Sequence, residues 1–117
     1  MKRLIVLFVI ISSGLLLSAQ QKGKASYYAD EFEGRKTASG ELYRHHLKTG
    51  AHKTLPFGTL VKVTNISNKK TVVVKINDRG PFVNGRIIDL SKSAAIQLGG
   101  VREGIFEVML EIKKPAR

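Results

Sequence analysis

Three side chains in this sequence are suited to acid–base chemistry: Glu41, His52 and Asp78. Asp78 follows an apolar, β-branched run over residues 72–76 and precedes several turn-forming residues. A side chain at such a strand end is held by a rigid element and faces an open groove, where catalytic and binding groups tend to lie. A carboxyl group in a loop, such as Glu41, can serve as a general acid or base if desolvation retains its proton.

Each candidate also has a simpler interpretation. Glu41 alone is compatible with a solvated loop acid, His52 with a packing or surface histidine, and Asp78 with a turn cap or an ion-pair partner. The adjacent His45 and His46 lack a third ligand at a suitable spacing, so we expect no metal site and no other cofactor. The residue types permit a shared acid–base site without requiring one.

The elements that must position these residues are mostly β. Runs of β-branched and apolar residues predict strands over the following ranges: 24–28, 60–64, 71–76, 85–90 and 106–112. Residues 67–69 should join two of these strands in a hairpin, and we interpret residues 30–50 as a long functional loop. Ser91 is a suitable N-cap for a helix over residues 92–98. Short strands with one small helix favour a closed barrel, which exposes no strand edge.

The last predicted strand indicates the composition of the core. Apolar and polar residues alternate from Phe106 to Ile112, which is the period of a strand with one buried face. We expect one core that contains Phe106, Val108, Leu110, Val72, Val74 and Ile88. Because the sequence has no cysteine, this core and the strand pairing must hold the domain together without disulfides.

Residues 1–19 have the features of a secretory signal. A charged start, Lys2-Arg3, precedes an almost unbroken apolar stretch and the small residues Ser18-Ala19. The apolar stretch is short for a membrane span of about 20 residues, so we expect cleavage near Ala19 and one domain over residues 20–117. The mature protein should be monomeric, without a stable membrane anchor, and periplasmic or extracellular. Without a cysteine it should not be a lipoprotein.

The strongly basic composition predicts an anionic partner. The formal net charge of the chain is +11, and basic surfaces attract anionic polymers. Nucleic acid is the default partner inside a cell. Export makes polymers of the cell envelope the expected partners instead, and we expect no nucleic-acid binding.

Several motifs stand in the order and spacing of a known family. They are GKASYY at 23–28, GRKTASGE at 34–41, AHKTLPFGT at 51–59, VTN at 63–65, NDRGPF at 77–82 and GRIIDLS at 85–91. With these motifs the chain resembles the rare lipoprotein A family, the septal-ring lytic transglycosylases of bacteria. The resemblance covers essentially all of the sequence after residue 19. It implies a six-stranded double-psi β-barrel with one or two short helices.

The resemblance also implies an activity: endolytic cleavage of the bond between N-acetylmuramic acid and N-acetylglucosamine in peptide-poor peptidoglycan, leaving anhydro-muramic ends. Its catalytic residues fall on Glu41, His52 and Asp78. We expect Asp78 to be the general acid/base, although Glu41 remains the alternative holder of the proton. Substrate contacts are expected from Tyr28, Thr37, Ser39, Lys53, Asn77, Arg79 and Asp89. The alternative function is a non-catalytic, expansin-like protein that binds cell-wall glycan.

Overall fold

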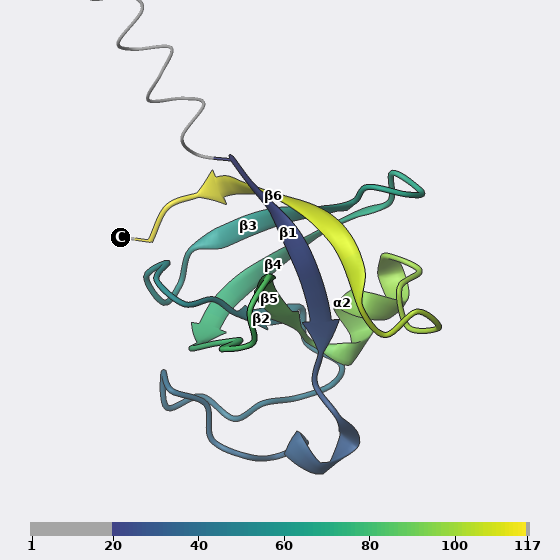
Figure 1. Ribbon diagram of the computed structural model, residues 1–117. Coiled ribbons are helices and arrows are strands. Elements are labelled where there is room, and N and C mark those ends of the chain that lie inside the picture. The colour runs from purple at the N-terminus through teal and green to yellow at the C-terminus, as the bar shows by residue number, and fades with distance from the viewer. Residues whose placement is uncertain (1–19, 117) are drawn as a thin grey trace, which may run out of the picture.

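A computed structural model describes residues 20–116, which form one closed barrel of six strands (Figure 1). The elements are β1 (Gln20–Tyr27), the 3-10 turn η1 (Asp30–Phe32), β2 (Thr49–Ala51), β3 (Leu60–Asn65), β4 (Thr71–Asp78), β5 (Arg86–Leu90), α2 (Lys92–Gln97) and β6 (Phe106–Lys114). The predicted signal over residues 1–19 lies outside the described residues. No helix in the described part of the chain is long and apolar enough to cross a membrane.

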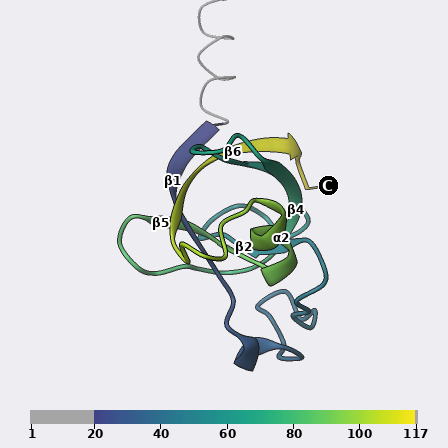
Figure 2. The same cartoon turned by 90° about the vertical axis from the view of Figure 1, so that its right-hand side faces the viewer.

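The barrel combines parallel and antiparallel strands in the order β1-β5-β2-β4-β3-β6. The pairs β1–β5 and β2–β4 are parallel, and the other four pairs are antiparallel. Figure 2 shows the strands curving into a ring, so that each one is paired on both sides. The predictions of a mostly β protein, a closed barrel and six strands are confirmed.

The core follows from the alternation of apolar residues along the strands. Phe106, Val108 and Leu110 of β6 are buried, while Glu107 between them is exposed. All six predicted core residues belong to one cluster, which also contains Ala94 of α2 and Leu98, the C-cap residue of that helix. The core prediction is therefore confirmed.

The connections agree with most of the local sequence signals. The predicted hairpin is formed by β3 and β4. Ser91 caps α2 by accepting a hydrogen bond from the main-chain nitrogen of Ala94. Gly99 adopts a positive φ of 69° after the helix, a conformation that costs glycine little.

The interpretation of residues 30–50 as one loop is wrong at its end, because Thr49–Ala51 forms β2. This strand has three residues, includes a glycine and pairs with β4 and β5. Its existence depends on these distant partners rather than on local propensity, so no local pattern indicated it. The strand predicted over 71–76 also continues further, to Asp78.

Candidate active site

A β-bulge in β4 sets the direction of the Asp78 side chain. Lys75 pairs with Thr49 of β2 and Asp78 pairs with Ala51, so three steps along β4 match two steps along β2. Asn77 is the additional residue, because it has no partner in β2. An extra residue reverses the normal alternation of side chains, so Lys75 and Asp78 lie on the same face of the sheet.

Four residues from four adjacent strands form a row across this face. Asp78 pairs with Ala51, Ala51 with Asp89, and Asp89 with Ser26 of β1. The neighbours of Asp89 along β5, Ile88 and Leu90, belong to the core, so the row lies on the opposite face of the sheet. The row therefore places two carboxyl groups on either side of a small residue.

Asp78 is fixed by donors from three parts of the chain. The Tyr28 hydroxyl donates to Oδ2 at 2.5 Å. The main-chain nitrogens of Ala38 and Arg79 donate to Oδ1, each at 2.9 Å. Asp78 is only partly buried, so a substrate can approach a carboxylate whose position is already determined.

Glu41 lies in a tight turn that docks against the end of β4. The main-chain nitrogen of Ser39 donates to the carbonyl oxygen of Asn77 at 3.2 Å. Lys75 donates to Oε2 of Glu41 at 2.8 Å, and the Asn77 side chain donates to Oε1 at 3.2 Å. The hydrogen bond from Lys75, followed by that from Asn77, holds the pKa of Glu41 below its usual range. This arrangement keeps Glu41 anionic and makes it a poor proton donor at neutral pH.

His52 approaches Asp78 through its main chain only. Its main-chain nitrogen donates to the Asp78 carbonyl oxygen at 3.1 Å. Its Nδ1 accepts from the nitrogens of Thr54 and Leu55, both at 3.1 Å, so Nε2 carries the hydrogen and donates to Oε1 of Gln21 at 2.9 Å. Among residues 20–116, no hydrogen bond joins this ring to the side chains of the two candidate acids.

The electrostatic environment of His52 favours the same neutral form. Burial lowers its pKa, and the positive charges of Arg79 and Lys53 lower it further. The structure thus gives His52 the features of a positioning residue, which fixes the turn after β2 and the end of β4.

The residues predicted to contact substrate divide into two groups. Thr37 and Ser39 shape the turn around Glu41 through their hydroxyl groups. Arg79 donates to the carbonyl oxygens of His52 and Leu55 and stacks on the Phe57 ring at 4.1 Å, so it braces the loop. The other four form the second group and do not brace loops. Tyr28, Asn77 and Asp89 lie around Asp78 and Glu41, and Lys53 is exposed.

Two hollows are lined by neighbours of Asp78: Asn77 lines one of them, and Tyr28, the hydrogen-bond partner of Asp78, lines the other. One, of about 230 Å³, is lined by Glu41, Lys75, Asn77 and Phe57 among others. The other, of about 490 Å³, lies beyond Tyr28 and is lined by Tyr27, Asp30, Lys92, Val101 and Ile105 among others.

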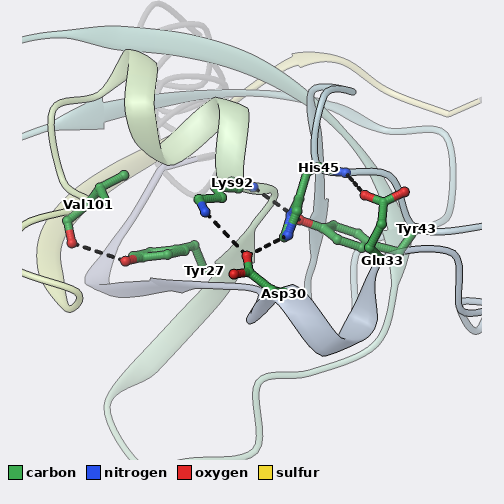
Figure 3. A network of polar contacts seen from close by, with 7 residues as sticks. All are labelled: Tyr27, Asp30, Glu33, Tyr43, His45, Lys92 and Val101. Carbon is green, nitrogen blue, oxygen red and sulfur yellow. Dashed lines mark hydrogen bonds and ion pairs between the residues drawn. The ribbon is translucent and has the colours of Figure 1, made fainter.

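A network missed at the sequence level supports Tyr28 (Figure 3). The ring of Tyr43 stacks on that of Tyr28, with 4.2 Å between centroids. His45 links Tyr43 to Asp30, through contacts of 2.6 Å at Nδ1 and 2.9 Å at Nε2. Lys92 contacts both residues that His45 links. Its main-chain nitrogen donates to the Tyr43 hydroxyl oxygen, and its Nζ donates to Asp30. An aromatic residue inside a polar loop, Tyr43, was the signal that could have indicated this network.

Three further contributors were not among the predicted site residues. Lys75 holds Glu41, Ser26 donates to Oδ1 of Asp89 at 2.8 Å, and the Ala38 main chain contacts Asp78. The first two look like ordinary strand residues, and a main-chain donor has no side-chain signature. Only the strand register shows that they belong to the site.

The family profile and similar proteins agree on one protein family. The profile of the family described as "Lytic transglycolase", a double-psi β-barrel family, matches residues 20–110. The protein named endolytic peptidoglycan transglycosylase RlpA of Pasteurella multocida is 54% identical over 90 residues, covering 77% of this chain and 31% of that protein. The protein of the same name from Campylobacter jejuni is 53% identical over 90 residues, covering 77% and 33%. The chain thus spans about a third of the length of these relatives.

Two solved structures share the fold. The Streptomyces papain inhibitor superposes with a TM-score of 0.63 at 24% identity, covering 79% of this chain and 92% of that one. The Clavibacter michiganensis expansin superposes with a TM-score of 0.62 at 22% identity, covering 84% and 52%. At these identities the comparison concerns the barrel alone.

Proposed function

The chain belongs to the lytic transglycolase family of double-psi β-barrels, and from this premise we propose that it is an endolytic peptidoglycan lytic transglycosylase. It cleaves the bond between N-acetylmuramic acid and N-acetylglucosamine within peptide-poor glycan strands and leaves anhydro-muramic ends. The observation that carries the proposal is the Asp78 carboxylate, which is held by three donors and is only partly buried. Catalysis needs no metal or organic cofactor in this scheme.

The reaction moves one proton and consumes no water. The C6 hydroxyl oxygen of the muramic acid attacks C1 of the same sugar, the C1–O4 bond breaks, and O4 of the leaving sugar gains a proton. Asp78 is the general acid/base, because it lies at the centre of the site and is held in one orientation. A fixed geometry of this kind lowers the barrier by placing the reacting groups in advance.

The neighbouring residues have supporting roles. Glu41, which Lys75 and Asn77 keep anionic, stabilises the positive charge that develops on the sugar ring. His52 positions the end of β4 through its main chain and the turn that its ring caps. Tyr28 orients the Asp78 carboxylate.

The basic character of the chain matches this substrate. Glycan without peptides exposes the lactyl carboxylates of muramic acid, and a strongly basic chain attracts them. The site of action is therefore the cell envelope, which the protein reaches as a monomer after cleavage near Ala19.

The proposed function is tested by digesting peptide-free glycan and determining the ends of the products by mass spectrometry. The parent protein should release anhydro-muramic ends, and Asp78→Asn, which keeps the size of the side chain but cannot exchange a proton, should release none while still binding glycan. Reducing ends would indicate hydrolysis instead. Tight binding by the folded parent without cleavage would refute the enzyme and favour an expansin-like binder.

A further inference from the structure

We propose that Asp89 is a second catalytic carboxyl group, which donates the proton that the leaving oxygen O4 receives, while Asp78 accepts the proton of the attacking C6 hydroxyl. This inference rests on the transglycosylase function proposed above and divides its proton transfer between two residues. It changes the role of Asp89 from a substrate contact to a reacting group.

The strand register places the two carboxyl groups in one row. Asp78 and Asp89 both pair with Ala51, from opposite sides. With adjacent strands about 4.8 Å apart, their Cα atoms are separated by roughly 10 Å. Ala51 is buried in a cluster with Tyr28 and Tyr43, and the charges of both acids act on the Tyr28 hydroxyl, so this hydroxyl lies near both carboxyl groups. A sugar bound against the Tyr28 hydroxyl would meet one acid on each side.

The two acids differ in their hydrogen bonds. Asp78 accepts three, two at Oδ1 and one at Oδ2. Asp89 accepts one, from the Ser26 hydroxyl to Oδ1, and no other hydrogen bond within the described residues reaches it. Its Oδ2 is therefore available to carry a proton and to present it to a substrate. Asp89 is only partly buried, so a substrate oxygen can reach it.

The charges around Asp89 favour its protonated form. Burial raises the pKa of Asp89, and the negative charge of Asp78 on β4 raises it further. The Ser26 hydrogen bond from β1 and the charge of Arg86 on its own strand act in the opposite direction, more weakly than burial. Tyr28 and Tyr43 also face it, and burial raises the pKa of both phenols, so they stay neutral. Two acids whose environments differ in this way are typical of an acid and base pair.

Glu41 is not suited to this donor role. Lys75 lies 2.8 Å from its Oε2 and lowers its pKa, so Glu41 lacks a proton to give at neutral pH. In the reaction, the C1–O4 bond breaks as the Asp89 proton passes to O4, and the C1–O6 bond forms as the O6 proton passes to Asp78. Exchange with solvent afterwards returns one proton to Asp89 and removes one from Asp78, so the cycle is balanced.

The first test compares Asp89→Asn with Glu107→Gln, which neutralises an exposed acid on β6. Both are assayed on peptide-free glycan and on an N-acetylglucosaminyl-N-acetylmuramic acid disaccharide that carries a 4-nitrophenyl leaving group. Asp89→Asn should reduce kcat on glycan about 100-fold or more with little change in KM. On the nitrophenyl substrate its loss should be less than tenfold, because nitrophenolate leaves without a proton. Glu107→Gln should match the parent on both.

A second readout is the carboxyl carbon chemical shift of Asp89, followed by NMR from pH 3 to pH 8. Its midpoint in the parent should lie above the ordinary aspartate value of about 3.9 and should fall in Asp78→Asn, since a negative charge has been removed. A midpoint at or below the ordinary value would overturn the inference. So would glycan cleavage by Asp89→Asn at the parental rate, or equal losses on both substrates. If the parent makes no anhydro ends at all, the proposed function fails and the inference fails with it.

Discussion

Tyr28 and Asp78 are joined by a hydrogen bond of 2.5 Å between a hydroxyl group and a carboxylate that lie 50 positions apart in the chain. Tyr28 is the first residue after β1, and Asp78 is the last residue of β4. The Tyr43 ring, stacked on Tyr28, fixes the direction of this donor. The relationship links the loop over residues 28–48 to the carboxylate on which the proposed chemistry depends.

Removing this donor should reduce activity without unfolding the barrel. A hydrogen bond to a charged group is worth about 1.5–3 kcal/mol, so Tyr28→Phe should lower kcat/KM by roughly 10- to 100-fold. The matched control is Tyr27→Phe, which removes the hydroxyl that donates to the Val101 carbonyl oxygen at 3.0 Å. That variant should lose some stability and keep its activity. Equal losses of activity in the two variants would contradict a specific role of Tyr28.

The Lys75–Glu41 pair makes a prediction about pH. Lys75 is the main cause of the lowered pKa of Glu41, so Lys75→Met should raise that pKa toward its ordinary value of about 4.3. If Glu41 acts as an anion, the acidic limb of the pH–activity profile should move to higher pH in this variant. Lys113→Met, on the exposed end of β6, serves as the control and should leave the profile in place.

The same pair has a consequence for stability. The folded pKa of Glu41 is lowered, so its contribution to stability is present above the unfolded pKa and is lost as pH falls through the folded value. Urea unfolding should therefore show a smaller loss of stability below about pH 4.5 in Glu41→Gln than in the parent. A parallel dependence in both proteins would show that the pair contributes nothing measurable.

His52 should destabilise the fold in acid. Burial, followed by the charges of Arg79 and Lys53, lowers its folded pKa below the unfolded value of about 6.5. The unfolded chain then binds more protons, so the free energy of unfolding should fall as pH decreases through this range. His52→Gln keeps an acceptor for the turn and should remove that dependence between pH 7 and pH 5. The exposed His46 provides the control, and His46→Gln should keep the parental slope.

The core of β6 should respond according to burial rather than to residue type. Phe106→Ala and Leu110→Ala remove side chains that are 8% and 3% exposed, and each should cost about 2–5 kcal/mol of unfolding free energy. Ile112 belongs to the same alternating series but is 39% exposed. Ile112→Ala should therefore cost clearly less in urea unfolding. Three equal costs would indicate a different packing of this strand.

Binding to glycan should weaken with added salt. A basic protein is attracted to a polymer that carries carboxylates, and added salt screens this attraction. The affinity for peptide-free glycan should therefore decline between 50 and 300 mM sodium chloride. Chitin oligosaccharides, which have the same sugar backbone without lactyl carboxylates, should bind with a much flatter dependence. Isothermal titration at several salt concentrations compares the two ligands directly.

The sequence predicted what depends on neighbouring residues and missed what depends on distant pairing. The hairpin of β3 and β4, the Ser91 cap and the alternation of β6 each have a local physical cause, and all are confirmed. The strand β2 has no such signal, yet it is the element that brings Asp78 and Asp89 into one row. The sequence therefore indicated the candidate acids better than it indicated their partners.

The motif around His52 shows the same difference between local sequence signals and contacts made by distant residues. The residue types marked this position as part of a possible site, but they could not show that its ring would accept from the main chain of residues 54 and 55 and donate to Gln21. The direction of a ring depends on the turn that contains it. Lys75 and Glu41, which are 34 positions apart, likewise meet only because the loop folds back on β4.

The bulge at Asn77 makes the geometry of the site depend on the strand register as well as on the residue types. If β4 paired regularly with β2 over this stretch, without the bulge, plain alternation over the three steps from Lys75 would turn the Asp78 carboxylate toward the hydrophobic interior. A chain paired in this way would still carry every candidate site residue. A redesign that grafts the site onto another barrel must therefore transfer the irregular strand pairing along with the side chains.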